Sequence, residues 1–163
     1  VDNLNGVSDR EKFRVRWYGK NSELLYRPIL ENKIKKNMQG YKIFFNLDDF
    51  KKKILNQKNL LNLTKTVNDL LPNKNLYPIT MTSYKRIYLI SSNNEIRATL
   101  DFNLQYKKLT NYIENFFTKV EDIILEFKYS TNLDSYLRKE ISGITRISKN
   151  SKYIKSLINN NFY

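Results

Sequence analysis

The chain has 163 residues and a formal net charge of +13, with 29 Lys and Arg against 16 Asp and Glu, and its length suits one domain with its own core. It contains neither Cys nor His, which excludes disulfides, thiolate or imidazole metal sites and catalysis by Cys or His, so a metal would need the oxygen ligands that Mg²⁺, Mn²⁺ or Ca²⁺ prefer. No apolar run approaches the roughly 20 residues of a membrane span, no signal peptide is recognisable, and the surplus of cations points to an anionic partner.

The N-terminal part has strand patterns. Residues 1–11 read as a loop that runs directly into a strand, so we expect a fragment whose upstream strands are missing. Residues 12–18 alternate strictly between polar and apolar, as a half-buried strand does. Residues 23–36 read as a long strand that is bent or interrupted at Pro28, because proline cannot donate to a ladder. Residues 41–47 are either a third strand or the lead into a helix.

The hydrophobic period becomes helical after the third strand pattern. Asp48 is the expected N-cap of a first helix over residues 49–57. Residues 60–71 continue in helical style and stop at Pro72, and residues 72–78 form a loop.

The C-terminal part begins with a hairpin pattern. Two strands at 79–90 and 95–104 flank a polar turn at 91–94. The next segment, 105–118, is ambiguous between helix and irregular structure. The remaining elements are a strand at 121–129, a helix at 132–140 capped by Asn132, and a helix at about 150–159. The sum is a single α+β domain over residues 1–163, with mostly antiparallel strands and helices between and after them.

Basic residues recur on one face of five of the predicted strands, as the rule that residues two apart in a strand share a face shows. The five sets are Lys12, Arg14 and Arg16; Glu31, Lys33 and Lys35; Tyr84, Arg86 and Tyr88; Glu95, Arg97, Thr99 and Asp101; and Asp122, Ile124, Glu126 and Lys128. A solvated sheet face explains any one set. The excess of cations in strand centres favours a curled sheet with its charged face inward, which forms a polar tunnel under a cover of helices. Such a lining suits a triphosphate or a polyanion.

Six short motifs follow one another along the chain: KFRVRWY, LENKIKK, SYKRIY, EIRATLD, ILEFKY and ISKNSKY. In this order they resemble the VTC domain, the polyphosphate polymerase branch of the triphosphate tunnel superfamily, over nearly the whole chain. The resemblance implies a barrel-like tunnel of antiparallel strands with flanking helices, incomplete here at its N-terminus. It also implies that the tunnel binds ATP with Mn²⁺ or Mg²⁺ and transfers the terminal phosphoryl group onto polyphosphate.

The resemblance assigns roles to individual residues. The catalytic cations are Arg14, Arg16, Lys33, Arg86 and Arg97; further phosphate-binding residues are Lys12, Lys128, Lys149 and Lys152; and the metal ligand is Glu126. The residues themselves suggest that Asp101 orients Arg86 or Arg97 rather than binding metal. Trp17 is expected in the core of the outer face, and Lys51, Lys52 and Lys53 on a solvated surface.

Two other function classes stay open at this point. The first is hydrolysis of triphosphate or tripolyphosphate, although the E-x-E-x-K strand of such relatives is not found in this sequence. The second is a non-catalytic module that binds polyphosphate or nucleic acid, since 22 aromatic residues offer stacking surfaces. Nucleic acid is the less expected partner, because no helix-turn-helix, zinc-finger or RNP-like pattern occurs. The resemblance implies ATP and polyphosphate as the partners, and use of ATP implies the cytoplasm.

Overall fold

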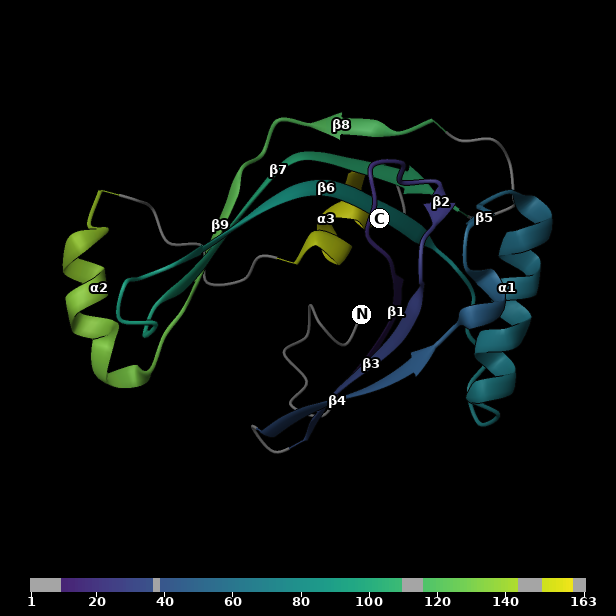
Figure 1. Cartoon of the computed structure of the whole chain (residues 1–163), viewed down its shortest axis with the longest axis horizontal. Coiled ribbons are helices and arrows are strands. Elements are labelled where there is room, and N and C mark those ends of the chain that lie inside the picture. Colours follow the sequence, from purple (N-terminus) through teal and green to yellow (C-terminus); the bar gives the residue numbers. More distant parts are fainter. Residues whose placement is uncertain (1–9, 37–38, 110–115, 144–150, 160–163) are drawn as a thin grey trace. The chain divides into compact units, whose positions relative to one another are not determined.

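Figure 1 shows the computed structural model of the chain. The structure describes residues 10–36, 39–109, 116–143 and 151–159. It divides into two compact units, residues 1–77 and residues 78–163. Each unit contains antiparallel strands and at least one helix, which confirms the predicted α+β class. The sheets are open in the part of the chain that the structure describes, so the strands do not close into a barrel there.

The first unit is built around a three-stranded sheet in the order β1-β3-β4. Its strands are β1 (Arg10–Arg16), β3 (Ile29–Lys36) and β4 (Gln39–Asn46). The segment at 41–47, which sequence patterns left undecided, is therefore a strand. A small ladder pairs β2 (Leu24–Leu25) with β5 (Lys53–Ile54), and Pro28 lies between β2 and β3 as predicted.

The apolar face of this sheet packs against helix α1 (Gln57–Leu70). The sheet contributes Val15, Leu30 and Phe45, which lie opposite one another in the register, and Trp17 packs against the same cluster. Leu63 and Val67 are the buried helical members. This core confirms the outer-face position of Trp17 and leaves the alternate residues of each strand, which carry the charges, on the opposite face.

The helix predicted over 49–57 is wrong. Asp48–Phe50 forms one short 3₁₀ turn, and the chain then enters β5 rather than an α-helix. Phe50 is buried in the core, and the pairing of β5 with β2 takes up backbone groups that a helix would need. The cap of α1 is Asn56, whose side chain accepts a hydrogen bond from the Asn59 backbone N–H at 2.9 Å.

The second unit has a long β-hairpin at its centre. Strands β6 (Thr80–Ile90) and β7 (Arg97–Lys108) form the hairpin, and β8 (Thr118–Val120) and β9 (Ile124–Lys128) both pair with β7. A 3₁₀ turn at Thr131–Leu133 leads into α2 (Asp134–Glu140), and α3 is Lys152–Asn159. The predicted hairpin, the strand within 121–129 and both helices are thus confirmed, but the predicted cap is wrong, since Asn132 lies in the 3₁₀ turn and Leu133 directly precedes α2. The ambiguous segment begins as a continuation of β7 and ends in β8.

An irregularity in the hairpin changes which β7 residues share a face. Asn103 has a positive φ of 52°, a conformation that asparagine tolerates, and the register shifts so that Asn103 and Leu104 together oppose Tyr84. The extra residue keeps Leu104 and Tyr106 on the same face as Asp101. Both are fully buried, so this face is charged at one end and part of the core at the other.

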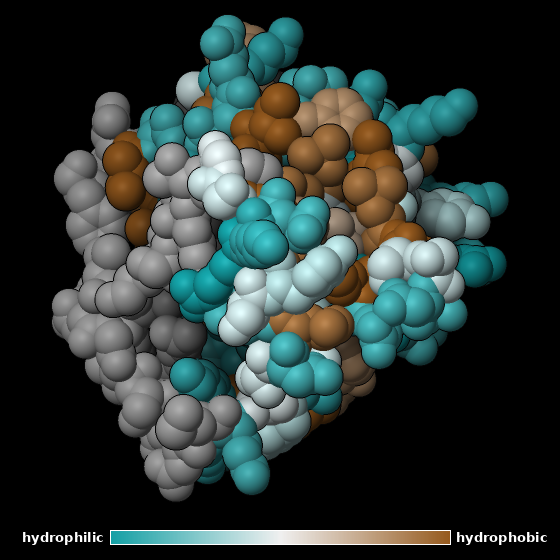
Figure 2. All heavy atoms as spheres, turned by 90° about the vertical axis from the view of Figure 1, so that its left-hand side faces the viewer, coloured by the Kyte–Doolittle hydropathy of each residue, from teal (hydrophilic) through white to brown (hydrophobic). Residues whose placement is uncertain are grey.

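Helices do not cover the apolar face of the second sheet in the described part of the chain, contrary to expectation. Ile87, Leu89 and Leu125 on that face are 45%, 53% and 38% exposed. Helix α3 instead lies on the charged face, where its first residue, Lys152, contacts Asp101. Figure 2 shows hydrophobic side chains gathered at the surface among hydrophilic ones. Among the described residues, the helices are all too short or too polar to cross a membrane.

Candidate functional site

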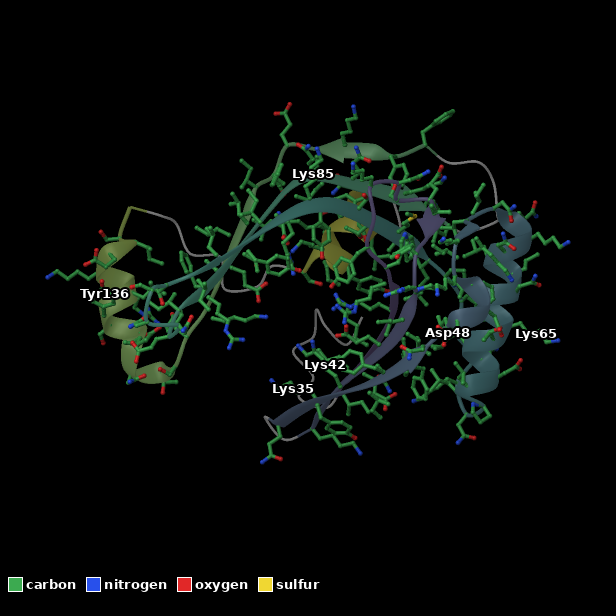
Figure 3. All side chains as sticks on the ribbon, in the orientation of Figure 1. Lys35, Lys42, Asp48, Lys65, Lys85 and Tyr136 are labelled. Carbon is green, nitrogen blue, oxygen red and sulfur yellow. The ribbon has the colours of Figure 1, made fainter. Side chains whose placement is uncertain are left out.

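A row of three lysines crosses the charged face of the first sheet. Lys33 on the central strand β3 lies directly opposite Lys12 on β1 and Lys42 on β4. Figure 3 shows Lys42 together with Lys35, the next residue of β3 on this face. Like charges in directly opposite positions destabilise a sheet. The row therefore indicates a face that is suited to an anion rather than one arranged for stability alone.

Glu31 is the acidic residue at the centre of this face. Arg14 donates to its Oε2 from Nη2 at 2.9 Å and from Nε at 3.3 Å. The Nε of Arg16 lies 3.3 Å from the same oxygen, and the Nζ of Lys42 lies 3.2 Å from Oε1. Glu31 is only 2% exposed, so one buried carboxylate holds cations from both neighbouring strands in place.

The pKa of Glu31 follows from this arrangement. Burial by itself raises the pKa of a carboxyl group, but hydrogen bonds and attraction from Arg14 and Lys42 outweigh it, and the net pKa lies below the ordinary value. Glu31 is therefore ionised at neutral pH and keeps the nearby cations in place.

Arg16 contacts two aromatic rings. Its guanidinium carbon lies 5.6 Å from the ring centre of Tyr18 and 5.7 Å from that of Phe44. Its Nη1 also donates to the Tyr18 hydroxyl at 2.6 Å. These contacts orient the guanidinium, which lowers the entropy that it loses when it binds a ligand.

The charged face of the second sheet is a grid of three rows. The strand register aligns Arg86 with Asp101 and Ile124, Tyr88 with Thr99 and Glu126, and Ile90 with Arg97 and Lys128. All nine side chains share one face, because directly opposite residues of antiparallel strands point the same way. The predicted members of this face are therefore brought together as expected.

Asp101 ties two of the predicted phosphate-binding cations together. Arg86 donates from Nε to Oδ1 at 2.5 Å and from Nη2 to Oδ2 at 2.7 Å, and the Nζ of Lys152 lies 2.5 Å from Oδ2. The expectation that Asp101 orients an arginine is confirmed for Arg86. Burial by itself raises the pKa of Asp101. Its hydrogen bonds to Arg86 and Lys152, and their attraction, lower the pKa by more than burial raises it, so the net pKa is below the ordinary value.

Aromatic rings also surround these cations. The guanidinium carbon of Arg86 lies 5.1 Å from the ring centre of Tyr84 and 5.7 Å from that of Tyr88. The Nζ of Lys152 lies 5.2 Å from the Tyr84 ring centre. Like Arg16 in the first unit, Arg86 is therefore fixed by a carboxylate and two rings, and its hydrogen bonds to Asp101 raise its pKa.

The opposite end of the grid is open. Arg97 lies directly opposite Lys128 and forms no ion pair with the described residues. Lys128 is 3.6 Å from Glu126, and both side chains are at least half exposed. This end therefore combines two cations with an accessible carboxylate.

Glu126 is the one predicted metal ligand, and its chemistry suits a hard cation. The part of the chain that the structure describes contains no group of three or more His, Cys, Asp or Glu side chains that could hold a metal. Mg²⁺ in phosphate-transfer sites typically uses one or two carboxylates together with water and substrate phosphates. A single exposed carboxylate beside cations fits that manner of binding, with most ligands supplied by the bound phosphates.

Sequence reasoning missed part of the site. Lys149 lies outside the described residues, Lys152 reaches the second charged face from α3, and every other predicted residue lies on one of the two charged faces. Lys42 was missed because the strand at 41–47 was left undecided; the alternation of Lys42 and Phe44 with apolar residues is the signal that could have found it. The part of Glu31 in holding three cations was also missed, since it depends on the register.

Comparisons with known proteins agree with the motifs. The sequence model of the VTC domain matches residues 1–159, and no curated protein matches the chain. The match covers both units and nearly the whole sequence. The chain therefore belongs to the VTC domain family, a membership that connects it with polyphosphate-related chemistry.

Proposed function

We propose that this chain acts as a single VTC domain that transfers the terminal phosphoryl group of ATP onto a polyphosphate chain. The observation that carries the proposal is the row Lys12, Lys33 and Lys42, with Arg14 and Arg16 beside it on the same sheet face. Such a concentration of cations around one buried carboxylate destabilises the sheet unless an anion binds there. The triphosphate tunnel implied by the family resemblance is part of this proposal.

The reaction requires little covalent chemistry from the protein. A terminal oxygen of the polyphosphate chain attacks the γ-phosphorus of ATP, a new P–O bond forms, and the bond to the β,γ-bridging oxygen breaks. ADP leaves with the electron pair of that bond, and the polyphosphate chain grows by one phosphate. What the protein has to supply is alignment and stabilisation of negative charge, so the absence of His and Cys from the sequence is no obstacle.

Different residues supply the alignment, the positive charge and the metal ligand. The guanidinium groups of Arg14, Arg16 and Arg86 are already oriented by carboxylates and rings, which suits bidentate binding of phosphate oxygens. Lys33 and Arg97, which have no ion pair with the described residues, supply uncompensated charge. Glu126 would hold Mn²⁺ or Mg²⁺, which neutralises charge on the transferred phosphoryl group when bound. Use of ATP implies that the protein acts in the cytoplasm.

The test is a synthesis assay with the purified chain. ATP, Mn²⁺ and a short polyphosphate primer are incubated with the protein, and the products are separated by length on a gel. Longer chains appearing together with stoichiometric ADP would support the proposal. Arg86→Gln and Glu126→Gln should each lower the rate about a hundredfold or more, in the range seen for loss of a transition-state donor. The matched control is Lys65→Gln, which removes a cation from the exposed surface of α1.

The same assay separates the other two function classes. Release of orthophosphate from tripolyphosphate without chain growth would show a hydrolase and overturn the transfer proposal. Binding of polyphosphate without any turnover of ATP or tripolyphosphate would show a binding module. Equal binding of polyphosphate and a single-stranded oligonucleotide would indicate a general polyanion surface and would also contradict the proposal.

A further inference from the structure

The hydroxyl oxygen of Thr99 is buried and has no hydrogen-bond partner among the residues that the structure describes. Native proteins pair nearly all such atoms, so each exception requires an explanation, for example a ligand that supplies the missing partner. Valine favours strands at least as well as threonine and has nearly the same shape. Folding of β7 therefore does not require a hydroxyl group at this position.

Thr99 occupies the centre of the charged grid of the second sheet. In its own row it lies between Tyr88 on β6 and Glu126 on β9. The neighbouring rows hold Arg86 with Asp101 on one side, and Arg97 with Lys128 on the other. Same-face residues along a strand are roughly 6–7 Å apart, so the hydroxyl is within reach of a ligand that contacts either row of cations.

We propose that Thr99 is a phosphate-binding residue whose hydroxyl donates a hydrogen bond to a non-bridging oxygen of the phosphate chain bound by Arg86, Arg97 and Lys128. The inference rests on the proposed function and extends it to a residue without charge. Tyr88 is 65% exposed and the Glu126 side chain 50%, so the two side chains beside Thr99 have room to move apart when a ligand arrives.

A hydroxyl adds a selectivity that cations lack. Lys and Arg attract any anion over several ångströms, whereas a hydroxyl on a short side chain bonds only to an oxygen close to the β7 backbone. Thr99 therefore distinguishes a phosphate chain that is seated on the grid from an anion held loosely above it. In the free protein the unpaired hydroxyl contributes nothing to stability.

The experiment measures tripolyphosphate binding by isothermal titration calorimetry and thermal unfolding for the full chain. Thr99→Val removes the hydroxyl and keeps the shape, and Thr99→Ser keeps the hydroxyl. Thr118→Val is the control, because Thr118 is an exposed residue on β8 of the same sheet. Each protein is titrated once in EDTA and once with Mn²⁺.

We expect Thr99→Val to weaken binding about tenfold in both buffers, since hydrogen bonds to charged groups have energies of that order. Its melting temperature should equal or exceed that of the wild type, while Thr99→Ser and Thr118→Val should bind within about threefold of it. A purely structural role of Thr99 would instead lower the melting temperature together with the affinity.

Several outcomes overturn the inference. Unchanged binding by Thr99→Val, equal losses in the Val and Ser variants, or a lower melting temperature for Thr99→Val would each contradict it. A loss seen only with Mn²⁺ would make the hydroxyl a metal ligand rather than a donor to phosphate. If the wild type itself fails to bind tripolyphosphate, the proposed function fails, and this inference fails with it.

Discussion

Arg86 and Asp101 lie directly opposite each other on β6 and β7 and are joined by two parallel hydrogen bonds, at 2.5 Å and 2.7 Å. This bidentate geometry is the one that Arg also uses to bind phosphate. Asp101 is only 1% exposed, so it holds the guanidinium from the sheet side. Arg86 is thus fixed in orientation before any ligand arrives.

Replacing Asp101 by Asn should therefore destabilise the second unit and weaken its anion binding. The amide keeps the shape but leaves Arg86 and Lys152 without their shared carboxylate, and loss of one partner of a buried ion pair typically costs about 3 kcal/mol. Thermal unfolding measures the loss of stability. Asp69→Asn on the exposed surface of α1 is the matched control, and an equal effect of both substitutions would contradict the assigned role.

Acid should destabilise the chain through Glu31 and Asp101. Both carboxyl groups have pKa values below the ordinary range, so their contribution to stability is complete above the unfolded value of about 4 and is lost as the pH falls toward the lower folded value. The melting temperature should fall steeply below about pH 4. Glu31→Gln should lower the melting temperature at pH 7 and flatten its decline in acid; a variant that keeps the steep decline would contradict this assignment.

Lys33→Gln should have opposite effects on stability and on binding. Removing the central charge of the lysine row relieves repulsion from Lys12 and Lys42. The free energy of unfolding should therefore rise by less than about 1 kcal/mol, and the melting temperature should rise slightly. Binding of tripolyphosphate should weaken several-fold, because Lys33 has no competing ion pair among the described residues. Lys65→Gln, the same change on α1, should alter neither quantity, and a weaker binding of that variant would show that only total charge matters.

Two lysines of α3 should differ in how much they stabilise the packing of this helix on the second sheet. Lys152 pairs with buried Asp101, whereas Lys155 pairs with Asp122, which is 43% exposed. Lys152→Met should lower the free energy of unfolding by about 2 kcal/mol or more. Lys155→Met should lower it by less than about 1 kcal/mol, because exposed ion pairs contribute little to stability. Hydrogen exchange of the α3 amides measures both effects. Equal acceleration in the two variants would show that burial of the ion pair is not what holds the helix.

The strands and their faces were largely predictable from the sequence. Alternation at 12–18 and the polar turn at 91–94 are local signals, and the side-chain period of a strand is a property of its backbone. The same locality explains the error at 49–57, where the apolar spacing resembles a helix but Phe50 is needed in the core and β5 pairs with β2. Tertiary contacts outweighed a weak local preference there.

The sequence by itself determined the α+β class, the family and which residues of each strand carry charge, because motif order and period-two alternation are written along the chain. Only the tertiary structure decided which charges meet. Asp101 shares a face with Arg97 but lies opposite Arg86, and Glu31 binds cations from two other strands. Such partners depend on register, which turns and the bulge at Asn103 set across distant parts of the chain, and a shift of one residue would reverse the faces.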